Sequence, residues 1–335
     1  MLPAPVSEYF SQGASACVTT SSAPEAWGRL RFRPRMLRDV SSVSTATEVL
    51  GHKLATPIMV APTTLQRAAH PDGEIATARG AAKAGSLMVV SSNAGSAFED
   101  IAATGVCWWL QPYVLRDRGL TSEMIKRGVD AGASAIVLTV DTPVVGRKHN
   151  AGEPVWDAVP AEFQRTNLNP NGLPEGALDK ADDLTPDSIG WLREMTGLPV
   201  VVKGILRADD ARTAVAAGAA AVYVSNHGGR QLDQAVATAD ALPAIAEAVA
   251  GTGAEVYVDG GLRRGEHIFG AMALGAKAVL LGRPVLWALT AGGESGSGGA
   301  DGVAELITEL TSELTHVMTL AGVHNADELT SDLVW

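Results

Sequence analysis

The sequence has few of the features that mark secreted, membrane-spanning or nucleic-acid-binding proteins. Only two of its 335 residues are cysteines, Cys17 and Cys107, which is too few for a disulfide framework, so a cytosolic protein is expected. No apolar run reaches the ~18–20 residues needed to cross a bilayer, and the N-terminus lacks the long apolar centre of a secretory signal. The net charge of −11 argues against nucleic acid and anionic membranes as partners, because both attract clustered positive charge.

Two further absences narrow the chemistry. The histidines outside the motif described below show no pairing at the spacing of metal ligands, so we expect no metal site. The arginines of residues 29–38 alternate with Leu30, Phe32 and Pro34, which favours local ion pairs over a polyanion site. The run Cys107-Trp108-Trp109-Leu110 is expected to be core.

From residue 57 onward the chain repeats one unit: a short apolar run, a polar loop and an alanine-rich helical stretch. The apolar runs are nearly continuous, which is typical of parallel strands buried on both faces. The expected strands are Ile58–Ala61, Leu87–Val90, Cys107–Leu110, Ala135–Leu138, Val200–Val202, Ala221–Val224, Glu255–Val258 and Ala278–Leu281. Eight such units predict a (β/α)8 barrel that forms a single domain over residues 1–335, with a doubly wound open sheet as the alternative.

Two segments interrupt the repeat. Residues 149–186 are polar and rich in proline, which predicts a long excursion after the fourth strand, with a mobile lid favoured and a partly disordered loop as the alternative. Residues 292–302 are rich in glycine and serine and predict a flexible linker before a final helix over residues 303–320.

Polar and glycine residues follow every predicted strand. A barrel carries its active site on the loops that leave the C-terminal ends of its strands. These positions hold Pro62-Thr63-Thr64, Ser91-Ser92, Gln111, Thr139 with Asp141, Lys203, Ser225 with His227 and Arg230, Asp259-Gly260-Gly261, and Gly282-Arg283.

The loop over residues 225–233, Ser-Asn-His-Gly-Gly-Arg-Gln-Leu-Asp, is the most informative of these. An imidazole accepts a proton near neutral pH, and a guanidinium grips a carboxylate with two parallel hydrogen bonds. His227 and Arg230 therefore suit a substrate that carries a carboxylate beside a removable proton, although a surface loop with a capping histidine is the alternative. Asp141 can orient and charge-balance the imidazolium, or it can form an Asx-turn before Pro143.

The last strands predict a phosphate site. Glycines let a phosphate approach the backbone closely, and an arginine beside a helix N-terminus attracts its charge. Both features occur in Asp259-Gly260-Gly261-Leu262-Arg263 and in Gly282-Arg283. Two ordinary tight turns are the alternative. Lys203 ends an all-valine strand and, if buried, needs an anionic partner such as a ring that becomes anionic on reduction. Four side chains can bond the edge of such a ring or simply cap a loop: Gln111, Thr139, Ser91 and Ser225.

Together these residues resemble the FMN-dependent 2-hydroxy-acid oxidase and dehydrogenase family, which includes glycolate oxidase, lactate oxidase and mandelate dehydrogenase. The resemblance runs from about Tyr9 to Val323 and weakens over residues 149–186. Residues 225–233 are its most specific match. The supporting matches are Phe32-Arg33-Pro34-Arg35, Ala61-Pro62-Thr63, His70-Pro71-Asp72-Gly73-Glu74, Leu138-Thr139-Val140-Asp141-Thr142-Pro143, Val202-Lys203-Gly204 and residues 259–265.

The resemblance implies that a 2-hydroxy acid is oxidised to a 2-keto acid while FMN is reduced. It implies hydride transfer to flavin N5, reoxidation by oxygen or another acceptor, and a homo-oligomer, in this family a tetramer. By position, His227 resembles the base and Asp141 its partner. Arg230 and Tyr9 resemble the groups that hold the substrate carboxylate, and Tyr113 resembles the tyrosine that bonds the substrate hydroxyl.

The resemblance also assigns the cofactor contacts. Lys203 resembles the lysine beside N1 and O2 of the flavin. The residues expected against the remainder of the cofactor are Pro62, Thr63, Thr64, Ser91, Gln111, Thr139, Ser225, Asp259, Gly260 and Gly261, with Arg263, Gly282 and Arg283 at the phosphate.

The chain departs from the family pattern at four places. Lys148, seven residues after Asp141, replaces a second carboxylate-binding arginine and keeps its charge without the bidentate fork. Thr64 stands where many relatives have alanine or glycine, and Asn93 occupies a position that is aromatic in glycolate oxidase. The chain also starts almost at Tyr9, without most of the family's first helix.

Two other functions remain as alternatives. One is another FMN barrel enzyme, such as type 2 isopentenyl diphosphate isomerase, which has no need of His227, Asp141 and Arg230 together. The other is a flavin-binding barrel with little or no turnover, which Lys148 and Thr64 suggest.

Overall fold

Eight parallel strands close into one barrel in this computed structural model, which describes residues 2–149, 152, 154–168, 173, 176–291 and 298–335. Neighbouring strands follow chain order, and β10 pairs with β3 to complete the ring. The strands are β3 (Ile58–Val60), β4 (Leu87–Ser91), β5 (Cys107–Gln111), β6 (Ile136–Thr139), β7 (Val200–Ile205), β8 (Ala221–Val224), β9 (Glu255–Val258) and β10 (Ala278–Leu281). The predicted barrel is confirmed, and the open sheet is wrong.

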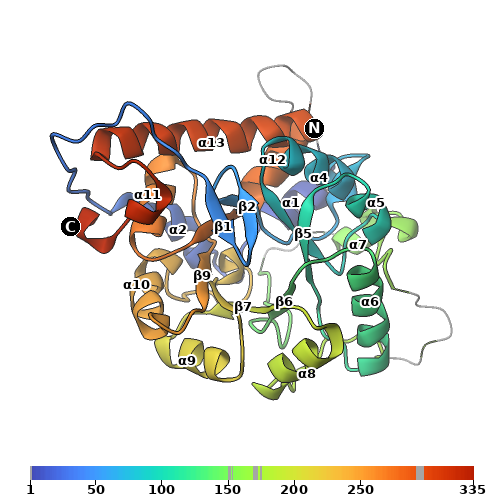
Figure 1. Cartoon of the computed structure of the whole chain (residues 1–335). Coiled ribbons are helices and arrows are strands. Elements are labelled where there is room, and N and C mark those ends of the chain that lie inside the picture. The colour runs from blue at the N-terminus through green and yellow to red at the C-terminus, as the bar shows by residue number, and fades with distance from the viewer. Residues whose placement is uncertain (1, 150–151, 153, 169–172, 174–175, 292–297) are drawn as a thin grey trace.

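Helices cover the outside of the barrel (Figure 1). They are α3 (Gln66–Ala69), α4 (Gly73–Lys83), α5 (Phe98–Ala102), α6 (Arg118–Asp130), α8 (Asp187–Thr196), α9 (Ala208–Ala216), α10 (Thr238–Val249), α11 (Gly265–Ala273), α12 (Arg283–Ala291) and α13 (Ala300–Ala321). Helix α13 packs across α4, α11 and α12. It begins at Ala300, so the end of the predicted linker over residues 292–302 is helical, whereas residues 292–297 lie outside the described part.

Large side chains fill the barrel interior. Trp109, Tyr223 and Tyr257 are fully buried there, together with the smaller apolar side chains that point inward from the other strands. Burying a side chain of this size stabilises the fold by about 1.5–3 kcal/mol. The hairpin of β1 (Thr47–Val49) and β2 (His52–Leu54) adds Val49 and Leu54 to the same cluster, so it closes the N-terminal end of the barrel.

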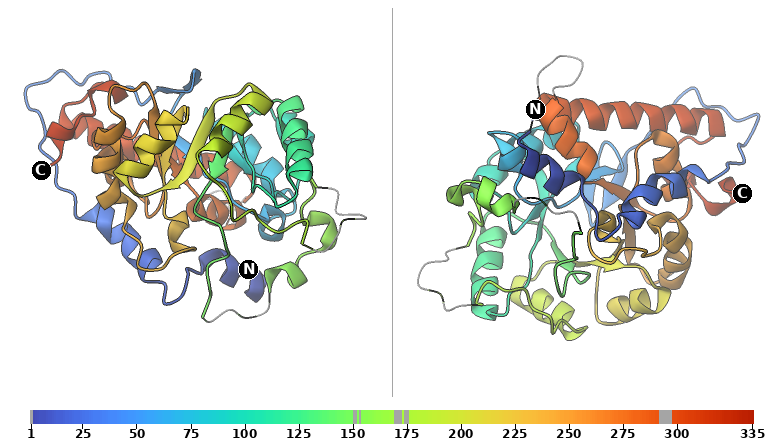
Figure 2. Two further views of the ribbon diagram at one scale, coloured as in Figure 1. Left: turned by 90° about the horizontal axis from the view of Figure 1, so that it is seen from below. Right: turned by 180° about the vertical axis from the view of Figure 1, so that it is seen from behind.

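The opposite end of the barrel carries the two N-terminal helices. Helices α1 (Ala4–Ser11) and α2 (Val18–Gly28) face the viewer in the right-hand panel of Figure 2, while the β1–β2 hairpin lies in front in Figure 1. The mouth formed by the C-terminal ends of the strands is therefore the one that α1 and α2 border.

The described parts of the excursion over residues 149–186 are attached to this mouth. Helix α7 (Val155–Ala158) packs against α1, and Val155 and Val159 share a buried cluster with Val6 and Phe10. Asn167 accepts a hydrogen bond from Phe98 N and donates one to Ser96 O, each 3.0 Å long. Lid motion of this excursion stays a prediction.

Two smaller expectations concern the surface. Arg29, Arg35 and Arg38 form ion pairs with Asp240, Asp332 and Glu328, which confirms the expected ion pairing for these three of the five arginines in residues 29–38. Among the described residues, no helix is both long enough and apolar enough to span a membrane.

Candidate active site

The loop after β8 projects His227 into the mouth of the barrel. His227 adopts a φ of +56°, a left-handed conformation that costs a side-chain-bearing residue about 1–2 kcal/mol. Its backbone N–H donates to Ser225 Oγ over 3.0 Å, which fixes the start of the turn. Gly229 has a φ of +73°, and a Cβ there would lie 2.6 Å from the backbone nitrogen of Thr20 on α2. Glycine is therefore required at position 229 for the loop to pack against α2.

Asp141 is the partner of His227. Asp141 Oδ1 lies 2.9 Å from His227 Nδ1, although the two residues come from the loops after β6 and β8. Gly204, at a bulge in β7 with a φ of +111°, makes this approach possible, because a Cβ there would lie 2.7 Å from Asp141 Cβ. The predicted pairing is thus present in the structure.

The charges around this pair set their protonation. Burial raises the pKa of Asp141, but Lys203 and His227 outweigh it, so the pKa is below its usual value and the carboxylate is ionised. Burial, with the charge of Lys203, lowers the pKa of His227 despite Asp141. The imidazole is consequently neutral at pH 7, and a proton on Nδ1 facing Asp141 leaves Nε2 able to accept another.

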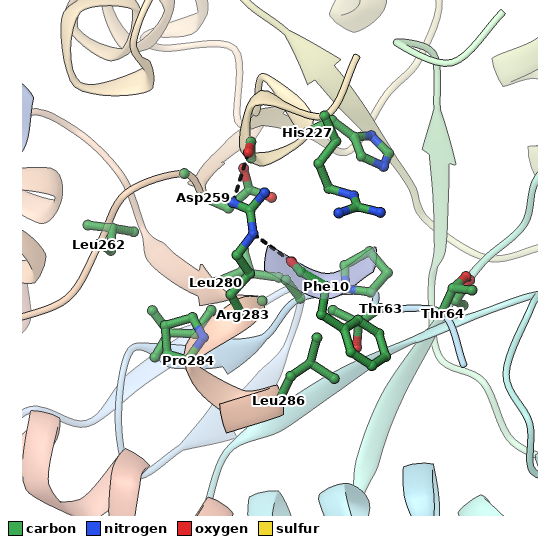
Figure 3. A pocket seen from close by; sticks show the side chains of 18 of the residues that line it. Phe10, Thr63, Thr64, His227, Asp259, Leu262, Leu280, Arg283, Pro284 and Leu286 are labelled. Atoms are coloured by element: carbon green, nitrogen blue, oxygen red, sulfur yellow. Dashed lines mark hydrogen bonds between the residues drawn. The ribbon is translucent and has the colours of Figure 1, made fainter. Parts of the chain in front are cut away.

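Two arginines hold the end of α1 over the mouth. Arg230 Nη1 donates to Tyr9 O over 2.7 Å and to Gln12 O over 3.0 Å, and its guanidinium lies 4.7 Å from the centre of the Tyr9 ring. Arg283 donates to Phe10 O over 3.0 Å, as Figure 3 shows, and to Gly228 O over 2.9 Å. The predicted residues Tyr9 and Arg230 are therefore in contact.

Two lysines also face this region. Lys148 Nζ donates to Arg230 O over 2.7 Å, and burial together with the charge of Arg230 lowers its pKa to about 8. Lys180 Nζ lies 3.6 Å from the centre of the Tyr113 ring, and burial lowers its pKa to about 8 as well. Sequence reasoning missed Lys180, because it lies inside the excursion among aspartates with no spacing that links it to Tyr113.

Beneath these residues lies a buried charged group. Lys203 Nζ is 4.0 Å from Asp259 Oδ2, and both side chains are nearly inaccessible to solvent. Asp259 Oδ1 accepts a hydrogen bond from Ser225 Oγ over 2.7 Å, and Asp259 Oδ2 accepts one from Tyr223 over 2.8 Å. Ser225 thus supports Asp259 and His227, and a direct contact between Ser225 and a cofactor stays a prediction.

Two adjoining cavities open at this end of the barrel. The first is lined in large part by residues predicted as cofactor contacts, and Figure 3 shows His227, Thr63, Thr64, Asp259 and Arg283 around it. The residues predicted for the cofactor that line it are Pro62, Thr63, Thr64, Ser91, Lys203, Asp259, Gly260, Gly261, Arg263, Gly282 and Arg283. The second cavity, of about 680 Å³, contains Lys148, Lys180 and Asn93 and shares Tyr9, Thr64, Tyr113, His227 and Arg230 with the first.

Two buried side chains next to the first cavity suit a flat heteroaromatic ring. Gln111 and Thr139 do not line this cavity themselves, but they pair in the sheet with Ser91 and Lys203, which do. Gln111 and Thr139, at the ends of β5 and β6, are buried, and Gln111 Nε2 and Thr139 Oγ1 have no hydrogen-bond partner within the described part of the chain. Unpartnered buried polar atoms are uncommon in proteins, so these two atoms indicate a missing polar ligand group. This observation agrees with their predicted contact to the isoalloxazine of FMN.

The same cavity fits a phosphate. Burial lowers the pKa of Arg263, and it lowers that of Arg283 to about 10, while neither forms an ion pair among the described residues. Gly261 has a φ of +85°, and a Cβ there would lie 2.5 Å from the backbone of Ala23, so the turn requires glycine. Partly buried cations beside the first turns of α11 and α12 suit the phosphate of FMN.

Among the residues that the structure describes, no three histidine, cysteine, aspartate or glutamate side chains come together as metal ligands.

The chain is similar in sequence and structure to known proteins, and this similarity agrees with the site described above. The family model described as FMN-dependent dehydrogenase matches residues 1–335. Glycolate oxidase 1 of Zea mays is 44% identical over 310 residues, which cover 88% of this chain and 83% of the relative. L-lactate oxidase of Nostoc sp. is 43% identical over 307 residues, covering 86% and 84%. A solved structure of mandelate oxidase with (S)-2-phenylpropionate superposes with a TM-score of 0.89 at 39% identity, covering 100% of this chain and 94% of the other.

Proposed function

The chain belongs to the FMN-dependent dehydrogenase family, and from this premise we propose that it oxidises a small 2-hydroxy acid with a side chain larger than that of glycolate. As a member of this family it is an FMN-dependent oxidoreductase. The observation that carries the proposal is the contact of 2.9 Å between His227 and Asp141, beside Arg230 and Tyr9 at one cavity mouth.

His227 acts as the base. Its Nε2 takes the proton of the substrate hydroxyl while the carbon–oxygen bond becomes a double bond, and Asp141 stabilises the imidazolium that results. When bound, FMN supplies the two-electron acceptor for the α-hydrogen and its electron pair, and oxygen or another acceptor then reoxidises it. The low pKa of His227 suits a base that must be neutral before the reaction.

Arg230 and Tyr9 hold the substrate carboxylate. The guanidinium is oriented by its bonds to the carbonyls of Tyr9 and Gln12, so it meets the substrate with little loss of side-chain entropy. Lys148 donates a hydrogen bond to the carbonyl oxygen of Arg230 and so stabilises the position of this residue. Its ammonium group also adds a positive charge to the site that binds the substrate carboxylate.

Tyr113 donates a hydrogen bond to the substrate oxygen that becomes the carbonyl. Burial raises the pKa of Tyr113 far above its usual value, so the phenol stays protonated and remains a donor. The cation of Lys180 over its ring stabilises this side chain in the cavity.

The preference for a larger side chain rests on the second cavity. Its volume of about 680 Å³ exceeds what the hydrogen on the α-carbon of glycolate needs. Apolar side chains form a large part of its wall: Leu115, Val144, Val145, Val155, Trp156, Leu168 and Leu178. Burial of an apolar substituent in such a cavity is favourable by roughly 25 cal/mol per Å² of surface removed from water.

Anaerobic mixing tests this function. The yellow protein is mixed with glycolate, lactate, 2-hydroxybutyrate and mandelate, and loss of the flavin absorbance reports reduction. We expect faster bleaching by the larger acids than by glycolate, and the speed of recolouring in air then separates an oxidase from a dehydrogenase. A yellow protein that none of these acids bleaches would instead be a flavin-binding barrel without this turnover.

His227→Ala tests the role of His227 as the base. This variant should keep the yellow colour, since the cofactor cavity is lined by many other residues, and should lose bleaching by about a thousandfold or more. Reduction at the rate of the unchanged protein would remove His227 from the mechanism.

A further inference from the structure

Tyr223 lies inside the barrel directly beneath the cofactor cavity. It is the third residue of β8, and in the sheet register it stands beside Lys203 on β7 and Tyr257 on β9. The side chain is fully buried, and its hydroxyl donates to Asp259 Oδ2 over 2.8 Å. A buried phenol needs such an acceptor, because an unpaired hydroxyl in an apolar core is costly.

Lys203 competes for the same carboxylate oxygen. Its Nζ lies 4.0 Å from Asp259 Oδ2, beyond hydrogen-bond distance, and 5.4 Å from the centre of the Tyr223 ring. The other carboxylate oxygen accepts from Ser225 over 2.7 Å. Each oxygen of Asp259 already accepts one hydrogen bond from a hydroxyl, which weakens its attraction for a further donor, and Lys203 stays beyond hydrogen-bond distance on the wall of the cavity.

We propose that Tyr223 is a positioning residue that keeps Lys203 from closing onto Asp259, so that the ammonium charge stays directed at the cofactor cavity. The inference goes beyond the proposed function: it requires bound FMN, but it does not depend on which hydroxy acid is oxidised. Tyr223 acts through Asp259 and Lys203 and touches no substrate.

The physical consequence concerns the reduced cofactor, which carries negative charge. Without the phenol, Asp259 Oδ2 would be a buried anionic acceptor with no donor, and Lys203 could supply one by moving about 1 Å to the ~2.8 Å of a charge-assisted hydrogen bond. That movement takes positive charge away from the cavity. The reduced form of FMN then becomes less stable relative to the oxidised form, and the midpoint potential falls.

Tyr223→Phe tests the proposal, and Tyr257→Phe is its matched control. Tyr257 is the same residue type in the same barrel interior on the next strand, but its hydroxyl bonds Glu255, which also holds Leu50 of the β1–β2 hairpin. The midpoint potential of bound FMN is measured by equilibration with a redox dye. We expect Tyr223→Phe to shift the reduction equilibrium about tenfold toward the oxidised form, or about 30 mV for a two-electron couple. Tyr257→Phe should leave the potential unchanged.

A second measurement uses FMN-free protein. The charge of Lys203 contributes to the low pKa of His227. If Lys203 moves toward Asp259, the pKa of His227 should rise in Tyr223→Phe, as followed by NMR titration of the imidazole. Tyr257→Phe should show no such rise.

Asp259→Asn provides a double-mutant test of whether Tyr223 acts through this carboxylate. This variant removes the carboxylate that attracts Lys203, so the potential should rise above that of the unchanged protein. Adding Tyr223→Phe to Asp259→Asn should then change nothing further, since the tyrosine acts only through that charge.

Three results would overturn the proposal: an unchanged potential in Tyr223→Phe, an equal fall in Tyr257→Phe, or a further fall when Tyr223→Phe is added to Asp259→Asn. All of these are measured on bound FMN without substrate. They are therefore distinct from a failure of the proposed function, which would appear as yellow protein that no 2-hydroxy acid bleaches.

Discussion

Replacing Asp141 with asparagine removes one charge from the centre of the proposed mechanism. Asp141 Oδ1 is 2.9 Å from His227 Nδ1, so its negative charge directly stabilises the imidazolium that forms when His227 takes a proton. Opposite charges about 4 Å apart attract by about 4 kcal/mol at an effective dielectric constant of about 20, and the contact here is shorter. An energy of about 4 kcal/mol corresponds to about a thousandfold in rate, because about 1.4 kcal/mol changes a rate tenfold.

The assay is the rate of flavin bleaching by the best 2-hydroxy acid in anaerobic stopped flow. Asp141→Asn should keep the FMN absorbance, because Asp141 does not line the cofactor cavity, but should be reduced about a thousandfold more slowly. Asp240→Asn is the control, since Asp240 forms an exposed surface pair with Arg29 and should reduce at the unchanged rate. A rate for Asp141→Asn within tenfold of the unchanged protein would refute the reasoning.

Three further predictions follow from the site. Gly204→Ala should lower stability by about 1–3 kcal/mol in thermal or denaturant unfolding and slow bleaching, because its backbone has a φ of +111° and the new Cβ would press on Asp141. An unchanged stability and an unchanged rate of bleaching in Gly204→Ala would contradict the close approach of Gly204 to Asp141. The KM for the hydroxy acid should rise as the pH increases through about 8, because Lys148 and Lys180 lose their charge there, and Lys180→Met should make this rise shallower. A KM that does not change between pH 7 and pH 9 would count against both lysines. Arg230→Lys should raise KM about 10- to 100-fold with a smaller change in kcat, since lysine lacks the bidentate fork, and an equal loss in both constants would argue for a different role.

The sequence by itself determined the barrel and the kinds of side chain at its mouth. Buried parallel strands are continuous apolar runs, and this local property gave β8, β9 and β10 with the bounds that the structure has. The ends of parallel strands meet at one edge, so residues after each run could be assigned to one site without knowing their contacts. Strands β3 to β6 differ from the predicted bounds by one residue at one or both ends, and β7 differs most. Lys203 and Gly204 have the composition of a loop, but the strand continues through a bulge to Ile205 because Asp141 packs against the glycine.

Only the tertiary structure decided which of these side chains meet. The position of Lys180 over Tyr113 and the bond from Tyr223 to Asp259 each join residues from different loops or strands, whereas the contact of His227 with Asp141 was already expected from the resemblance. Their spacing in the chain carries no information about these contacts, because closure of the barrel sets the distances between loops. The same holds for Lys148: its sequence position indicated only a cation without the bidentate fork of arginine, whereas the structure shows its Nζ donating to the carbonyl oxygen of Arg230.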